Sequence, residues 1–150
     1  MEARNKIQKT VLFEKINQHF NGNLKDKVFA LWGLSFKPNT DDMREAPSRV
    51  LMEALWKAGA KVQAFDPEAM EETQSIYGNR DDLRLLGTKE EALKDADALV
   101  IITEWTNFRA PDFELINQLL REPLIFDGRN LFNPSRLSEK GFTYYSMGRK

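Results

Sequence analysis

The sequence lacks cysteine and contains a single histidine, His19, among its 150 residues. Without cysteine, the chain can form no disulfide, no thiolate metal site and no thiol nucleophile. One histidine also excludes a metal site built from several histidine ligands. His19 lies at the C-terminal end of a predicted helix, where a cation is mildly favoured. We interpret it as a surface or capping residue, because nothing near it in the sequence marks a catalytic base.

Neither sign of charge dominates, since 22 Lys and Arg oppose 23 Asp and Glu, for a net charge of −1. No overall field therefore draws the protein to nucleic acid or to anionic lipid. No apolar run approaches the roughly 20 residues of a membrane span, and the opening MEARNK has no apolar signal core. We expect a cytoplasmic protein with no nucleic-acid or membrane partner. Because this opening resembles the middle of a helix, we also expect a fragment of a longer protein.

Apolar and amphipathic stretches alternate along the chain, after a first helix predicted over residues 3–20. Strands are predicted at residues 28–32, 61–65, 98–103, 124–126 and 143–145, with a weaker short strand at 83–86. Helices are predicted at residues 47–58, 68–77, 88–94 and 111–120. This alternation is typical of a Rossmann-like, doubly wound, mostly parallel α/β sheet with flanking helices.

A long charged loop, GLSFKPNTDDMREAPS at residues 33–48, follows the first predicted strand. Open α/β sheets bind their ligands at this position. Lys37 and Arg44 are cations suited to phosphate, while Asn39 and Thr40 can hydrogen-bond a sugar or a base. On residue types alone, a capped and solvated loop is an equally good interpretation.

The same loop lacks the G-x-G-x-x-G turn of a dinucleotide site, because Phe36, Lys37 and Pro38 follow its only glycine, Gly33. Asp66 ends the second predicted strand, where an acidic residue holds a ribose hydroxyl in dinucleotide-binding domains. Without the glycines, we favour a simpler role for Asp66 as a turn former before a proline. The sequence therefore predicts a Rossmann-like scaffold without the usual dinucleotide fingerprint.

Two more polar runs follow predicted strands, DGRN at residues 127–130 and TEWTNFR at residues 103–109. Arg129 could reach an anionic ligand at the edge of the sheet that also carries the long loop, although an exposed surface turn is equally compatible with the sequence. In the other run, we expect Trp105 and Phe108 to pack as core or lid aromatics, because aromatic side chains bury large areas wherever they occur.

Three of these runs carry a resemblance to a known family. Residues 33–48, residues 127–130 and the run AFDP at residues 64–67 resemble the signatures of the UDP-binding domain in the UDP-glucose/GDP-mannose dehydrogenase family. The resemblance covers nearly the whole chain. Within the family, PNT at residues 38–40 and TEW at residues 103–105 are similar to the branch that oxidises UDP-glucose.

The resemblance implies that residues 1–24 are the tail of a central connecting and dimerisation helix, and that residues 25–150 form a UDP-sugar-binding domain. It implies the family reaction, in which two NAD-dependent steps oxidise a sugar alcohol to a carboxylate through a thiohemiacetal and a thioester on a cysteine. An N-terminal domain that this chain lacks would bind most of the NAD. The intact protein would form a homodimer through the central helix.

By position, the resemblance implies that Phe36, Lys37 and Arg129 contact UDP-glucose and that Arg44 faces the NAD side of the cleft. Since the chain has no cysteine, we expect it to have no dehydrogenase activity by itself. We also expect it to bind UDP only weakly, because the resemblance implies that half of the cleft and most contacts to the uracil lie outside this chain. The alternatives are a UDP-N-acetylmannosamine or GDP-mannose dehydrogenase of the same family, a nucleotide-binding module without a catalytic partner, and a dimerisation scaffold.

Overall fold

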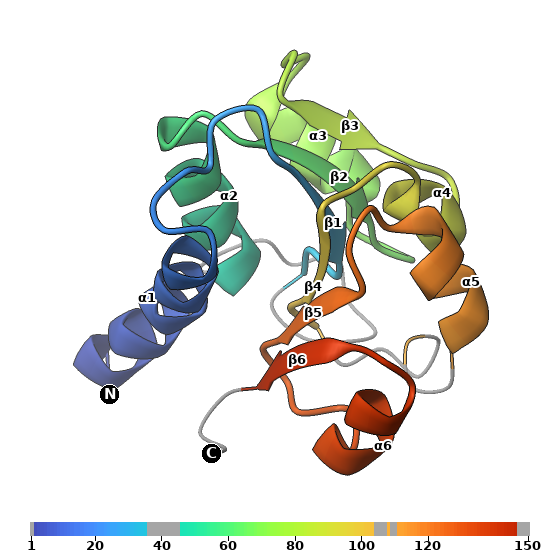
Figure 1. The fold of residues 1–150 in the computed structure, drawn as a ribbon. Coiled ribbons are helices and arrows are strands. Elements are labelled where there is room, and N and C mark those ends of the chain that lie inside the picture. The colour runs from blue at the N-terminus through green and yellow to red at the C-terminus, as the bar shows by residue number, and fades with distance from the viewer. Residues whose placement is uncertain (1, 36–45, 104–107, 109–110, 147–150) are drawn as a thin grey trace.

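The computed structural model describes residues 2–35, 46–103, 108 and 111–146, with the side chains of residues 2–10 excepted. Strands and helices alternate through this part of the chain (Figure 1). The strands are β1 (Val28–Trp32), β2 (Lys61–Phe65), β3 (Leu83–Leu85), β4 (Ala98–Ile101), β5 (Leu124–Asp127) and β6 (Thr143–Ser146). The helices are α1 (Glu2–His19), α2 (Pro47–Lys57), α3 (Met70–Tyr77), α4 (Lys89–Leu93), α5 (Phe113–Leu119) and α6 (Pro134–Glu139).

The six described strands form one sheet in the order β3-β2-β1-β4-β5-β6. Every neighbouring pair is parallel, which confirms the doubly wound sheet and makes it wholly parallel in the described residues. The chain runs outward from β1 to β3, returns to β4 and runs outward again to β6. The direction of winding therefore reverses between β1 and β4, and open α/β sheets bind ligands beyond the strand ends at such a point.

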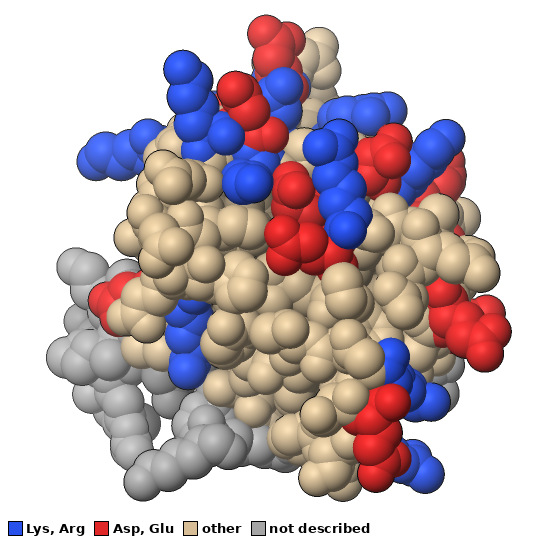
Figure 2. Space-filling view, viewed as in Figure 1, with Lys and Arg blue, Asp and Glu red and all other residues tan. Residues whose placement is uncertain are grey.

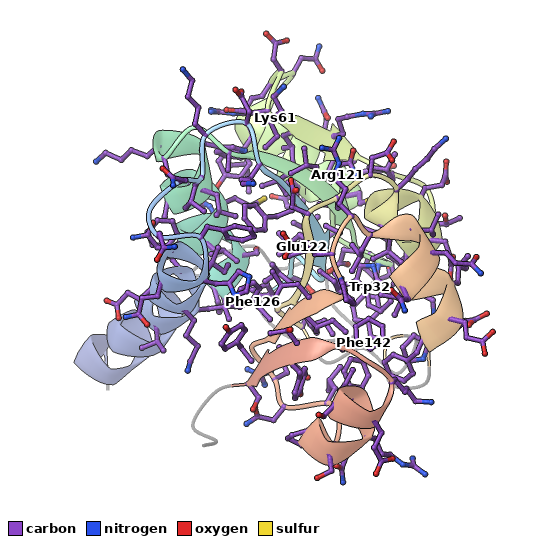
Figure 3. The ribbon with its side chains drawn as sticks, viewed as in Figure 1. Trp32, Lys61, Arg121, Glu122, Phe126 and Phe142 are labelled. Carbon is purple, nitrogen blue, oxygen red and sulfur yellow. The ribbon has the colours of Figure 1, made fainter. Side chains whose placement is uncertain are left out.

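Both faces of the sheet are buried, as a parallel sheet requires. Phe29 and Leu31 of β1 belong to a core that includes residues of α1 and α2. Ala30 and Trp32 of the same strand belong to a second core, which includes residues of α4, α5 and α6. Figure 1 shows α1 and α2 on one side of the sheet and α5 on the other. In Figure 3, the labelled Phe126 and Trp32 lie toward these opposite sides.

The second half of α1 is bound to the sheet through Leu12 and Ile16, which are both buried. At its end, His19 Nδ1 lies 2.9 Å from the Tyr145 hydroxyl and its Nε2 lies 3.7 Å from a Glu122 carboxylate oxygen. The His19 side chain is only 23% exposed. It therefore does more than cap the helix or cover the surface, which were the roles predicted from the sequence. It anchors the helix end to β6 and to the turn before β5, on the amino side of that strand.

The structure departs from the sequence predictions at two helices. Helix α6 was not predicted, although its start carries a usual signal: Pro134 is its first residue, and the preceding Asn133 side chain accepts the N–H groups of Ser135 and Arg136. Helix α3 begins at Met70 rather than at residue 68. The chain before it forms a turn instead, as the contacts of Asp66 explain below.

Candidate functional site

The loops after β1 and β4 meet at the carboxyl edge of the sheet, where the winding reverses. Gly33 has a φ of +100°, and a Cβ at this position would lie 2.6 Å from the backbone nitrogen of Thr103. The Thr103 hydroxyl donates a hydrogen bond of 2.8 Å to the backbone carbonyl of Ser35. The Thr103 and Ser35 side chains are both buried. The two loops are therefore in direct contact, and only a glycine fits at the first position after β1.

Asp66 holds the beginning of the loop after β1. One of its carboxylate oxygens accepts the N–H groups of Leu34 and Ser35 at 2.7 and 3.1 Å and the Ser35 hydroxyl at 3.3 Å. The other accepts the N–H groups of Glu68 and Ala69, both at 2.8 Å. The side chain is fully buried, so these donors replace the water that an exposed carboxylate would bind. The predicted role of Asp66 as a turn former is confirmed, and these contacts make the turn that delays α3.

This arrangement does not fit a dinucleotide in the first βα turn. In dinucleotide-binding domains, glycines let the pyrophosphate approach the backbone and an acidic residue binds the ribose. Here the space beside Gly33 is filled by Thr103. The Asp66 carboxylate is committed to backbone and Ser35 donors. The described residues of this turn therefore form a loop that is fixed by buried hydrogen bonds. Any NAD would have to bind elsewhere.

A second loop, residues 128–131, begins directly after the last residue of β5. Asp127 is fully buried, and its two carboxylate oxygens accept the N–H groups of Arg129 at 2.8 Å and Leu131 at 2.7 Å. The N–H of Gly128 donates to the carbonyl of Ile101 at 2.8 Å, and a Cβ on Gly128 would lie 3.0 Å from that carbonyl oxygen. The loop is thus bound to the end of β4, beside the loop that follows β1.

Tyr144 of β6 completes the contacts of this loop. Its hydroxyl donates to the Asp127 carboxylate at 2.6 Å and lies 3.3 Å from the carbonyl of Phe132. Tyr144 pairs with Ile125 in the sheet register, and side chains two residues apart in a strand share a face, so Tyr144 and Asp127 lie on the same face. Tyr144 was not predicted as a site residue, because the register of β6 on β5 cannot be derived from the sequence pattern.

The predicted site residues divide into two groups. Arg129 is exposed at the carboxyl edge, on the loop held by Asp127. Phe36, Lys37 and Arg44 lie outside the described residues, within the segment that joins Ser35 to Ala46.

Of the two aromatic residues predicted to pack within residues 103–109, the structure describes only Phe108. Phe108 is fully buried and stacks on Trp32, with 5.2 Å between ring centroids and 26° between ring planes. It also meets the ring of Phe65 edge-on, at 6.3 Å. The predicted core packing of Phe108 is confirmed. Trp105 lies outside the described residues.

The groups with shifted pKa values lie away from this edge, between α2, α3 and the turn after α3. Burial and a hydrogen bond to Glu53 raise the pKa of Tyr77 to about 12. The Arg80 guanidinium hydrogen-bonds the Asp82 carboxylate at 2.7 and 3.1 Å and lowers the pKa of Asp82. These interactions join two helices to the β3 side of the sheet, and we assign them a structural role.

Other ligand classes find little support in the described ranges. They contain no group of three or more His, Asp or Glu side chains arranged to hold a metal ion. None of their helices is both long and apolar enough to cross a membrane. Figure 2 shows Lys and Arg interspersed with Asp and Glu at the top of the molecule, above a broad region without charge. The charged region of this face therefore has no single sign.

The strand order and the parallel pairing define a Rossmann-like α/β domain. The described part of its first βα turn lacks the features of a dinucleotide site, and its reversal point is where open α/β sheets generally bind ligands. The family model described as "UDP-glucose/GDP-mannose dehydrogenase family, UDP binding domain" matches residues 30–134. The chain therefore belongs to this family and corresponds to its UDP-binding domain, which confirms the resemblance seen in the sequence.

Individual relatives agree with this assignment. The chain is 47% identical to a UDP-glucose 6-dehydrogenase of Pseudomonas aeruginosa, over 99% of this chain and 34% of that protein. It is 40% identical to a UDP-glucose 6-dehydrogenase of Rhizobium meliloti, over 98% and 33%. A solved NDP-N-acetyl-D-galactosaminuronic acid dehydrogenase from Methanosarcina mazei superposes with a TM-score of 0.76 at 25% identity, over 95% of this chain and 29% of that one. The chain spans about a third of the length of the curated relatives it matches.

Proposed function

We propose that this chain is the UDP-binding domain of a UDP-glucose 6-dehydrogenase. In the proposed reaction, UDP-glucose, two NAD⁺ and water give UDP-glucuronate, two NADH and three protons. The observation that carries the proposal is the 47% identity to a dehydrogenase of that name, which extends over 99% of the chain and includes both loops of the carboxyl edge.

The loops after β1 and β5 supply the proposed substrate contacts. Because β4 lies between these strands, the two loops flank its end, and a ligand placed there could touch both. Arg129 offers a planar fork for a diphosphate, and Lys37 offers a point charge. We assign Phe36 to one wall of the substrate pocket and Arg44 to the side facing the NAD-binding part.

The redox chemistry belongs to parts outside this chain. The chain has no cysteine to carry the thioester, and its first βα turn does not fit a dinucleotide. When bound elsewhere in the enzyme, NAD supplies the hydride acceptor. This chain would bind and orient the nucleotide end of the substrate. We further propose that residues 1–24 are the tail of the helix that connects the two halves and forms a homodimer, and that residues 25–150 are the binding domain.

The proposal is tested by titrating the isotopically labelled chain with UDP and, separately, with GDP, while following backbone amide shifts by NMR. We expect weak, saturable UDP binding that perturbs Arg129 and its neighbours, and a smaller response to GDP. A preference for GDP would favour the GDP-mannose branch, and no response of the Arg129 loop to either nucleotide would contradict the proposal. NADH formation by the chain alone, with UDP-glucose and NAD⁺, would overturn its assignment as a non-catalytic part.

A further inference from the structure

The hydroxyl of Tyr144 contacts both ends of the loop that carries Arg129. It donates to Asp127, the residue before the loop, at 2.6 Å, and lies 3.3 Å from the carbonyl of Phe132, the residue after it. We propose that Tyr144 is a positioning residue for nucleotide binding: it holds the Asp127 carboxylate, which in turn orders the loop and directs Arg129. This inference rests on the proposed role of Arg129 as a contact of UDP.

The loop includes an unfavourable backbone conformation, which contacts from its surroundings must hold in place. Asn130 has a φ of +56°, in the left-handed region that non-glycine residues seldom occupy. The Asp127 carboxylate compensates by accepting the N–H groups of Arg129 and Leu131. It can do so only while its two oxygens keep their present orientation. Anything that fixes this carboxylate therefore also fixes the loop.

Tyr144 is well suited to fix it. The residue belongs to β6, which pairs in parallel with β5, so its backbone is set by the sheet rather than by the loop. An O–H donor to a carboxylate makes a short and strong hydrogen bond, and the 2.6 Å distance is of this kind. The carboxylate itself is fully buried, so water would not easily replace a lost hydroxyl.

The next residue along the strand provides a matched control. Tyr145 lies on the opposite face of β6, where its ring stacks on Phe126 at 5.0 Å and its hydroxyl lies 2.9 Å from His19 Nδ1. Tyr145→Phe removes the same atom from the same strand. Its effect falls on the contact between the end of α1 and the sheet, and it removes no hydrogen bond described for the Arg129 loop.

The test compares UDP dissociation constants of the whole chain by NMR titration. We expect Tyr144→Phe to raise the constant about fivefold, as part of a charge-assisted hydrogen bond is lost, and Tyr145→Phe to change it less than about twofold. In an Arg129→Ala background, Tyr144→Phe should cause no further loss, because it acts through Arg129. A wild-type constant for Tyr144→Phe, or an equal loss with and without Arg129, would overturn the inference.

A second measurement separates this inference from the proposed function. If Arg129→Ala binds UDP as well as the wild type does, the proposed contact of Arg129 fails, and if the wild type does not bind UDP, the proposed function fails, whatever Tyr144 does. Amide hydrogen exchange then decides the loop-ordering step without any ligand. Exchange of the Arg129 and Leu131 amides about tenfold faster in Tyr144→Phe than in Tyr145→Phe supports that step. Equal exchange in the two variants contradicts it.

Discussion

The carboxylate of Asp66 accepts a hydrogen bond of 2.7 Å from the backbone N–H of Leu34, a residue 32 positions earlier in the chain. This contact connects the end of β2 to the chain that leaves β1. Together with the hydroxyl of Thr103, which reaches the carbonyl of Ser35, it sets the starting point of the long loop. The proposed substrate contacts on that loop therefore depend on buried groups that would not themselves touch the substrate.

Replacing Asp66 with Asn should destabilise the fold strongly, because the side chain keeps its size but replaces one accepting oxygen with an N–H₂ donor. That group would face backbone N–H donors, and about 3 kcal/mol of unfolding free energy should be lost. Urea denaturation measures the loss. Asp112→Asn is the control, since Asp112 caps α5 at an exposed position and Asn caps helices equally well. Equal losses in both variants would contradict the bracing role of Asp66.

Gly33→Ala should also destabilise the chain, by about 3 kcal/mol, because it combines an unfavourable φ with a steric clash. The added Cβ would lie 2.6 Å from the backbone nitrogen of Thr103. Gly141→Ala separates the two causes, since Gly141 has a φ of +87° and a Cβ added there would meet no atom within 4 Å. We expect about 1 kcal/mol for that control. Thermal and urea unfolding of the two variants should differ accordingly, and similar values would exclude the clash.

In the dehydrogenase that we propose contains this chain, Lys37→Ala and Arg129→Ala should each raise KM for UDP-glucose about tenfold, because each removes a cation from the diphosphate. The kcat should fall only if the sugar is also misplaced. Steady-state kinetics measure both constants.

Lys61→Ala is the control for these two variants. Lys61 is exposed at the first residue of β2 and therefore lies at the amino edge, at the top of the molecule in Figure 3. Its kinetics should match those of the wild type. Unchanged constants in both Lys37→Ala and Arg129→Ala would remove these residues from the site.

Deprotonation of Tyr77 should lower the free energy of unfolding at alkaline pH. Burial and the hydrogen bond to Glu53 raise the pKa of Tyr77 to about 12 in the folded chain, from an ordinary value of 10.0. The unfolded state therefore releases this proton first, so the stabilisation is complete below about pH 10 and is lost as the pH rises toward 12. The unfolding free energy of the wild type should fall more steeply over this range than that of Tyr77→Phe. Parallel curves for the two proteins would contradict the shift.

Local patterns were sufficient to predict most of the sheet. The strands at Val28–Trp32 and Lys61–Phe65 were predicted with their observed bounds, because a central parallel strand must be apolar on both faces. Helix α2 likewise begins at the predicted Pro47. The late start of α3 was not predictable, since the donors that would begin that helix bind Asp66 instead, and this depends on where β2 ends in space.

The sequence by itself determined the class of the fold, the family, and the placement of Arg129 at the carboxyl edge of the sheet, because all three depend on residue order and local periodicity. The hydrogen bonds that hold the loops at that edge were decided only by the tertiary structure. Thr103 reaches Ser35 across 68 positions, and Tyr144 reaches Asp127 across 17. The first contact requires the strand order that places β4 beside β1, and the second requires the register of β6 on β5. No local pattern encodes either.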